Sequence, residues 1–252
     1  MFEPTIPFGE PELMRASAYR LYLKELEEEA AKAGVPSRFA SLSPSLRADL
    51  YRFEADGAGS EVVEVIAACV RHAKRVTIHL QRGDRVVPLT VFPEERLVHC
   101  PLPVPQLVAG GFTELRVMHV EPAVLRPPGD EESGLVGERR MHYPLGPLLW
   151  ELAMRGNRSE LLPEIAGPAI YRVTPGLQPA GLPVSSTMLA AIYRLRRAGT
   201  TLSQIAEWPG MDREHAMRLL NGLYLQAGLM VSRSHPDAIN ESWKRRTKAP
   251  ER

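Results

Sequence analysis

The chain has 252 residues, of which 44% are apolar and 24% charged, and its formal net charge is +1. These values are ordinary for a soluble globular protein of one large domain or two small ones. No apolar run approaches the roughly 20 residues that span a bilayer, and the first residues, MFEPTIPFGEPELM, lack the features of a secretion signal. Only Cys69 and Cys100 are present, so we expect a cytoplasmic protein without a disulfide framework and without membrane contact.

The balance of charge differs between the two ends of the chain. Residues 185–252 contain 11 Lys and Arg against 6 Asp and Glu, whereas residues 1–184 contain 20 against 24. The C-terminal part is therefore the basic end, which favours an anionic partner there.

The first 140 residues predict an α+β domain, with N-terminal helices and a small antiparallel sheet. After a proline-rich arm, apolar residues recur at helical spacing, and Gly34 ends the first helix. From Arg75 the chain changes to short runs rich in β-branched residues with turns between them. Pro88 predicts an edge strand or a bulge in the second of these runs. We place helices at about 12–33, 43–53 and 60–73, and strands at about 75–81, 85–92, 96–102 and 112–121.

The middle of the chain is rich in proline and glycine. Residues 125–140 predict a linker or a long exposed loop, and a helix follows from about Gly146 to Arg155. The proline-bearing stretch 174–184 is the expected boundary before a further domain. We therefore expect an α+β domain over 1–140, a helix and Pro/Gly-rich connector over 141–184, a C-terminal domain over 185–235, and a basic tail over 236–252.

The C-terminal domain has the pattern of three helices followed by a strand. Ser185 caps the first helix and Gly199 ends it, and a short second helix lies within 201–210. Asp212 caps the third helix, which runs to about Gln226, and LMVSR then begins a strand.

This succession of elements resembles the winged helix-turn-helix superfamily, over about 50 of the 252 residues. The residues that carry the resemblance are apolar positions on the three helices, namely Ile192, Leu195, Leu202, Ile205, Ala206, Ala216, Leu219, Leu220 and Leu223, with AGLM after them. The resemblance implies a compact winged-helix domain. The same pattern serves DNA-binding proteins and protein-docking modules alike.

In DNA-binding members the outward face of the third helix enters the major groove. The helical spacing projects Glu214, Arg218, Asn221 and Leu225 onto that face. Arg and Asn read bases, whereas a glutamate repels phosphate, so the face is mixed, and cations elsewhere would have to add phosphate contacts. The candidate residues for DNA or partner contact are Arg194, Arg197, Arg213, Arg218, Asn221, Arg233, Lys244, Arg245 and Arg246.

Two Cys/His pairs are candidates for a metal site or a nucleophile, namely Cys69 with His72 and His99 with Cys100. Successive strand residues point to opposite faces, so at most one of His99 and Cys100 can join the first pair. We favour two buried thiols over a zinc site or a Cys/His nucleophile. No established nucleotide-binding, zinc-protease or nucleophile motif occurs, and we predict no catalytic residue, metal or cofactor.

Two functions are compatible with this reading. The first is a bacterial-type cytoplasmic regulatory or adaptor protein that acts in transcription regulation and binds DNA through its C-terminal winged helix. The second keeps the fold but uses the winged helix for protein–protein interaction within a larger assembly. An enzyme with a site near Cys69 is a third and weaker hypothesis, and the oligomeric state stays open.

Overall fold

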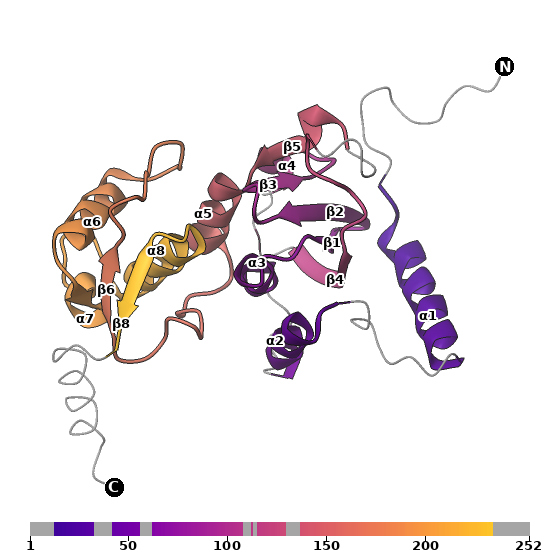
Figure 1. Ribbon diagram of the computed structural model, residues 1–252, viewed down its shortest axis with the longest axis horizontal. Helices are drawn as coiled ribbons and strands as arrows, with labels where there is room; N and C mark the ends of the chain where they lie inside the picture. The colour runs from indigo at the N-terminus through magenta and orange to yellow at the C-terminus, as the bar shows by residue number, and fades with distance from the viewer. Residues whose placement is uncertain are drawn as a thin grey trace, which may run out of the picture. The chain divides into compact units, whose positions relative to one another are not determined.

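The protein is described by a computed structural model that covers residues 13–32, 42–55, 62–107, 112, 115–129 and 137–233. The chain divides into two compact units, Met1–Leu145 and Gly146–Arg252, which Figure 1 shows in indigo to pink and in pink to yellow. Each unit combines helices with an antiparallel sheet, so the mixed α+β class expected from the sequence is found.

The first unit contains a five-stranded sheet with helices around it. Its elements are α1 (Ala16–Lys32), α2 (Pro44–Ala55), α3 (Val62–Arg71), β1 (Val76–Arg82), β2 (Arg85–Phe92), β3 (Leu97–His99), α4 (Val104–Leu107), β4 (Leu115–Pro122), a 3-10 turn (Arg139–Met141) and β5 (His142–Pro144). The three expected helices correspond to α1–α3 and the four expected strands to β1–β4, whereas β5 was not foreseen.

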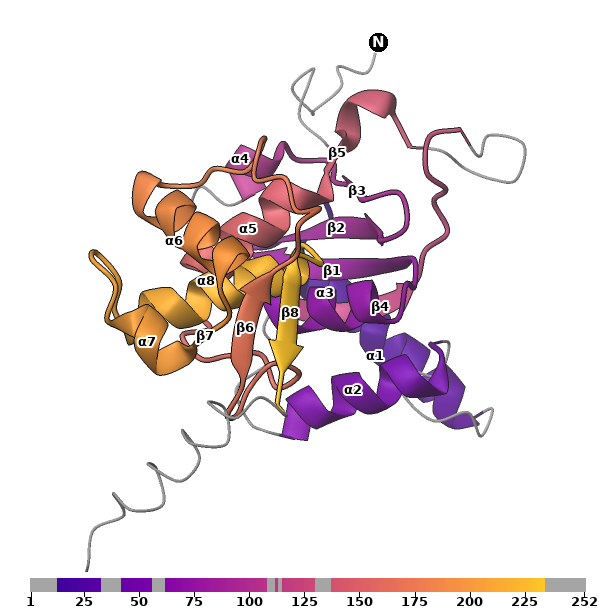
Figure 2. The ribbon, with the colours of Figure 1, turned by 60° about the vertical axis from the view of Figure 1, so that its left-hand side comes forward.

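The strands of this sheet follow the order β4-β1-β2-β3-β5, and all neighbours are antiparallel. One face is apolar, because Ile78 pairs with Leu89 on one side and with Val120 on the other, and all three are fully buried. Figures 1 and 2 show α3 beside β1 and β4. Eight of the ten residues of α3 are buried, which is why its sequence, VVEVIAACVR, is apolar on nearly all sides.

The opposite face of the sheet carries a row of polar side chains. The register places Glu121, Thr77, Thr90, His99 and His142 directly opposite one another, in a row that crosses all five strands. The two threonine hydroxyls lie 3.0 Å apart, and the two histidine rings meet edge to face with their centroids 4.9 Å apart. Helix α1 packs on this face, as its Tyr19 stacks on the ring of His79.

The position of Pro88 differs from the expected edge strand or bulge. Strand β2 lies inside the sheet, where Pro88 pairs with His79 of β1. Strand β3 is short and pairs only with residues 90–92, so none of the described strands pairs with β2 at Pro88 on that side. Proline has no backbone N–H, but at this position it removes no hydrogen bond between β2 and β3. The irregularity in register occurs instead between β1 and β4, at His79 and Leu80.

The described residues of the second unit form a three-stranded sheet and four helices. Its elements are α5 (Leu145–Arg155, whose first residue closes the first unit), β6 (Ile170–Val173), α6 (Ser186–Arg197), β7 (Thr200–Thr201), α7 (Leu202–Ala206), α8 (Arg213–Leu225) and β8 (Leu229–Ser232). The expected cap residues act as predicted, since Ser185 accepts from Met188 N and Asp212 accepts from His215 N. Thr201 and Gln204 form a capping box at α7.

The segment expected as a connector is instead part of this unit. Its residues 170–173 form β6, which lies between β7 and β8 in the sheet order β7-β6-β8 (Figure 2). The proline-rich flanks hid the strand, because IYRV is too short to show alternation clearly. Tyr171 is fully buried and donates to Ile165 O at 2.7 Å, which holds the chain before the strand in place.

Helix α5 runs antiparallel to α8 along much of its length. Gln226 at the end of α8 donates to Gly146 O at the start of α5, and Arg218 near the start of α8 donates to Gly156 O after the end of α5. Between them, a Cβ atom at Gly222 would lie 3.0 Å from Cε3 of Trp150. The two helices therefore approach closely at a position where α8 has no side chain.

Candidate functional site

The face of α8 that the sequence projected outward is covered by the protein's own second unit. Asn221 is 2% exposed, accepts from Leu162 N at 2.9 Å and donates to Glu160 O at 2.8 Å. Leu225 is also 2% exposed. The prediction that these two residues face solvent is therefore wrong, because α5 and the segment after it pack on that side of the helix.

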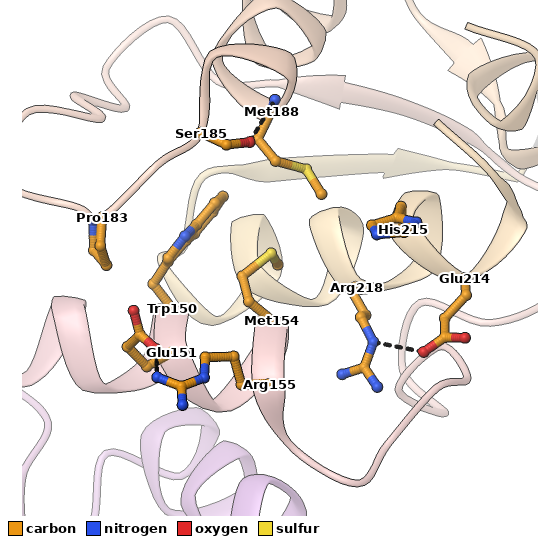
Figure 3. Close-up of a pocket in the computed structure, with 10 residues that line it drawn as sticks. All are labelled: Trp150, Glu151, Met154, Arg155, Pro183, Ser185, Met188, Glu214, His215 and Arg218. Carbon is orange, nitrogen blue, oxygen red and sulfur yellow. Dashed lines mark hydrogen bonds and ion pairs between the residues drawn. The ribbon is translucent and has the colours of Figure 1, made fainter. Parts of the chain in front are cut away.

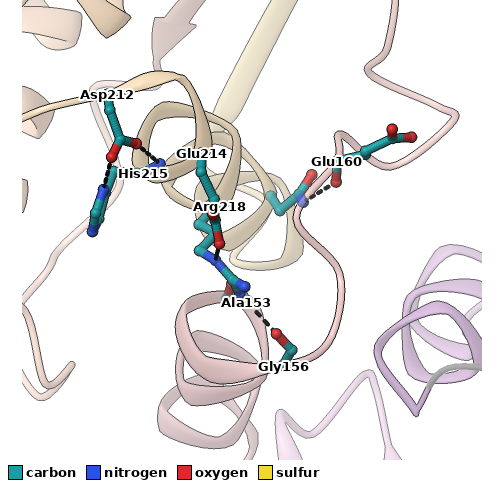
Figure 4. Close-up of polar contacts among 8 residues, drawn as sticks. Ala153, Gly156, Glu160, Asp212, Glu214, His215 and Arg218 are labelled. Carbon is teal, nitrogen blue, oxygen red and sulfur yellow. Dashed lines mark hydrogen bonds and ion pairs between the residues drawn. The ribbon is translucent and has the colours of Figure 1, made fainter. Parts of the chain in front are cut away.

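Arg218 binds the C-terminal end of α5 and does not project into solvent. Its guanidinium donates to Gly156 O at 2.8 Å, to Ala153 O at 3.3 Å and to Glu214 Oε1 at 2.9 Å (Figure 4). The side chain is 15% exposed. A cation in this position satisfies carbonyl groups that a helix leaves unpaired at its end and complements the helix dipole. The expectation that Arg218 reads bases has no support in this geometry.

The other predicted contact residues that the structure describes come from separate elements of the second unit. Arg194 lies over the ring of Trp208, 5.4 Å from its centroid, and Arg233 donates to Glu164 O at 2.8 Å. Arg197 and Arg213 are exposed, one at the end of α6 and the other at the start of α8. Lys244, Arg245 and Arg246 lie outside the described residues.

Two features of the sequence signal that α8 is covered on a second side. Gly222 stands in the middle of the third helix, where glycine costs about 1 kcal/mol relative to alanine and so marks a close approach. The α5 sequence, LGPLLWELAMR, is apolar on most of its circumference, which is typical of a helix enclosed within its domain. Neither feature identifies α5 as the element that packs on α8. The contact between Trp150 and Gly222 is seen only in the fold.

A pocket of about 480 Å³ lies between α5, the chain entering α6, and the first turns of α8. Figure 3 shows its apolar part, to which Trp150 and Met154 of α5 and Met188 of α6 contribute. Methionine side chains adapt to the shape of an apolar ligand, because they are unbranched and polarizable. The lining residues are Trp150, Glu151, Met154, Arg155, Pro183, Ser185, Met188, Glu214, His215 and Arg218.

The rim of the pocket is polar and carries both signs of charge. Arg155 pairs with Glu151 at 3.3 Å, and Arg218 pairs with Glu214 at 2.9 Å. His215 is exposed and its Nδ1 lies 2.9 Å from Asp212 (Figure 4). The hydrogen bond from the His215 backbone N–H lowers the pKa of the Asp212 carboxyl, which keeps this helix cap ionised. The pocket therefore offers a balanced rim, unlike a site for a polyanion.

Trp150 adds a hydrogen-bond donor to the apolar part of the pocket. The residue is 1% exposed and lines the pocket. Buried tryptophans usually pair this N–H, since leaving a donor unsatisfied costs free energy. An acceptor on a bound ligand would satisfy it.

The two cysteines and the histidines near them in the sequence lie in different environments within the first unit. Both thiols are fully buried, and desolvation raises the pKa of Cys69 to about 12 and that of Cys100 to about 11, so both stay protonated. His72 bonds Asp49 at 2.5 Å. Burial, with a smaller contribution from nearby His142, lowers the pKa of His99 and favours its neutral form. Within the described part of the chain, no three His, Cys, Asp or Glu side chains are placed to hold a metal ion.

The described helices include none with both the length and the apolar character needed to cross a membrane. Comparison of the chain with models of protein families, with curated proteins and with solved structures found no match.

Proposed function

We propose that the second unit is a winged-helix-type module that docks a segment of another protein in the pocket between α5, α6 and α8. The observation that carries this proposal is the hydrogen bonding of Asn221 and Arg218 to the backbone of residues 153–162. A third helix whose outer face is closed in this way cannot enter a major groove without losing α5. The pocket beside it stays open.

The arrangement of strands also favours docking over DNA binding. The resemblance implies a wing after α8, which would contact nucleic-acid backbone. In this unit the strand that pairs with β8 is β6, which precedes the three helices in the chain. Strand β8 is the last strand of the described residues, so none of the strands described after α8 can form a wing hairpin with it.

The chemistry of the pocket indicates what kind of segment it takes. Its apolar lining, to which Trp150, Met154 and Met188 contribute, suits a large apolar anchor. The two ion pairs on the rim suit a segment that carries charges of both signs. A partner peptide with a leucine, methionine or aromatic residue between charged residues fits these requirements.

DNA binding is tested directly by the salt dependence of affinity for a random duplex. If only Arg197 and Arg213 meet phosphates, two contacts predict about a tenfold fall in affinity between 50 mM and 200 mM salt. Six to ten contacts predict a fall of about 10³ to 10⁵. We expect weak binding or none, and a steep salt slope abolished by Arg197→Ala with Arg213→Ala would establish the DNA-binding alternative.

Docking is tested by site-specific photo-crosslinking in cells that naturally produce the protein. A photoreactive amino acid at His215, on the pocket rim, should yield a protein adduct, and the same group at exposed Arg172 on β6 should not. Filling the pocket with Met154→Arg should remove the adduct without lowering the thermal midpoint by more than a few degrees. Equal adducts at both positions, or an adduct that survives Met154→Arg, would contradict docking at this pocket.

A further inference from the structure

Helix α1 exposes apolar side chains on the side that faces away from the sheet. Its inner side is held by the first unit, since Ala16 and Tyr19 are about 5% exposed and pack with Val86. On the outer side, Leu21 is 60% exposed and Tyr22 is 47% exposed. They are among the most exposed large apolar side chains of the described residues, and they lie side by side.

The position of α1 on the sheet is fixed by polar contacts, so its outer side has a defined orientation. The backbone N–H of Ala16 donates to Asp84 O at 2.7 Å, and Arg20 donates to Gln81 Oε1 at 2.7 Å. Tyr19 stacks on His79 with ring centroids 4.9 Å apart. A helix held this way presents the same stripe of residues to any partner.

The charges on α1 divide along its length. Arg15 directly precedes the helix, and Arg20 and Lys24 lie in its first half; all three are exposed, and Lys24 lies 3.8 Å from Glu28 of the same helix. The second half of the helix carries the exposed acidic residues Glu25, Glu27 and Glu28. Such a helix is complementary to a copy of itself that runs in the opposite direction, since each basic half then faces an acidic half.

We propose that α1 mediates self-association of the protein through antiparallel packing of its outer side against α1 of a second copy. A two-fold axis between Leu21 and Tyr22 places Leu21 of each copy against Tyr22 of the other copy. The same axis places Arg15 opposite the copy's Glu28, and it places the small Ala18 opposite the copy's Glu25. Every contact occurs twice, as in isologous dimers.

The helical spacing supports this pairing. Residues 18, 21, 22, 25 and 28 lie on one stripe of the helix, and Arg15, whose carbonyl accepts the N–H of Tyr19, directly precedes the first turn. Ala16, Tyr19 and Leu23 lie on the opposite stripe, which packs on the sheet. One helix pair buries less than the 1,200–2,000 Å² of a stable interface, and we therefore expect dissociation in the micromolar range, about 10–100 µM.

A charge exchange tests the proposal on the full-length protein by sedimentation equilibrium. Arg15→Glu alone gives repulsion with Glu28 of the second copy, and Glu28→Arg alone gives repulsion with Arg15. We expect each variant to dissociate at least about tenfold more readily than the wild type. An equimolar mixture of the two variants should associate again, because both cross-pairs are then attractive. Residues 15 and 28 are about 20 Å apart on one helix, so this rescue cannot arise within a single chain.

Two controls make the result specific to the outer side of α1. Glu27→Arg makes the same change of charge on the same helix, but residue 27 lies on the stripe of Ala16 and Tyr19, so mixtures with Arg15→Glu should not associate. Leu21→Glu should abolish dimers, and circular dichroism should show unchanged folding because Leu21 is exposed. A monomeric wild type at 500 µM would overturn the proposal, and so would dimers that all these variants leave intact, since another segment or surface would then be responsible.

Discussion

Asn221 shows how a polar residue in a helix serves as a connector when it is buried. Its side-chain oxygen accepts the N–H of Leu162 and its nitrogen donates to Glu160 O, so one amide satisfies two backbone groups of the chain that follows α5. Helical spacing from the apolar core placed this residue on the solvent side. The spacing places Asn221 correctly opposite the apolar core, but that side of the helix has a second neighbour.

Replacing Asn221 by alanine should lower the free energy of unfolding by about 1–3 kcal/mol. The substitution leaves the buried Leu162 N–H without its acceptor, and an unsatisfied buried donor costs its full desolvation free energy. Urea unfolding followed by tryptophan fluorescence measures the change. The control is Arg213→Ala at the exposed start of α8, for which we expect a change within about 0.5 kcal/mol. Equal stability of the two variants would show that the hydrogen bonds of the Asn221 amide do not contribute to the free energy of unfolding.

Glu121 makes the stability of the first unit depend on pH in the acidic range. The hydrogen bond from His79 at 2.8 Å lowers the pKa of the Glu121 carboxyl below its usual value of 4.5. The folded state therefore binds this proton less tightly than the unfolded state does. The resulting stabilisation is present above about pH 4.5 and is lost as the pH falls through the lowered pKa.

We expect Glu121→Gln to flatten the acid limb of the stability curve between about pH 5 and pH 3. Unfolding midpoints in guanidinium chloride, measured at half-unit steps of pH, would show the wild type and the variant converging at the acidic end. Glu207→Gln changes an exposed carboxyl on the second unit and serves as the control. Parallel curves for the wild type and Glu121→Gln would mean that the His79–Glu121 pair does not contribute.

Among the elements, α8 is unusual because it is covered on two sides. Its inner residues Ala216, Leu219, Leu220 and Leu223 are fully buried, and the stripe through Arg218, Gly222 and Gln226 lies on α5. The caps Ser185 and Asp212 set where α6 and α8 begin, and both were recognised in the sequence because capping is a local interaction. The cover on α8 could not be recognised, because it depends on residues about 70 positions away.

Valine at position 222 should destabilise the second unit by about 1–3 kcal/mol. A Cβ atom there already lies 3.0 Å from Trp150 Cε3 and 3.3 Å from Met154 Cε, so two further methyl groups force the helices apart. Thermal unfolding monitored by circular dichroism measures the loss. Gly176→Val is the matched control, because no heavy atom lies within 4 Å of a Cβ at that glycine. A Gly222→Val variant as stable as the control would refute the close approach of α5 and α8.

At the scale of the whole molecule, the reactivity of both cysteines depends on the opening of the first unit. Cys69 and Cys100 are fully buried there, and their thiols have pKa values raised to about 12 and about 11. A thiol reagent reaches either group only when the unit opens, because reaction requires both access and the thiolate. The labelling rate is therefore a measure of opening.

Labelling of the native protein at pH 8 should be at least about 1,000-fold slower than labelling in denaturant, given the usual stability of folded domains. Mass spectrometry should then find two modified residues in the denatured chain, since the sequence contains two cysteines. A native protein that loses one thiol within seconds would show that Cys69 or Cys100 is accessible, and would reopen the question of a reactive thiol.

The sequence by itself determined the helices and strands of this protein wherever local interactions are sufficient. Short runs rich in β-branched residues marked β1 and β2, and side-chain caps and glycine stops marked α6 and α8, since these signals involve residues within a few positions of one another. Tertiary structure alone decided that β6 occupies the middle of the second sheet and that α5 covers α8. The physical reason is that an amphipathic pattern specifies that a face must be buried, but the partner that buries it is chosen by the packing of distant segments. The same reason placed Arg218 on carbonyl groups of its own chain, where the pattern alone had placed it on a free surface.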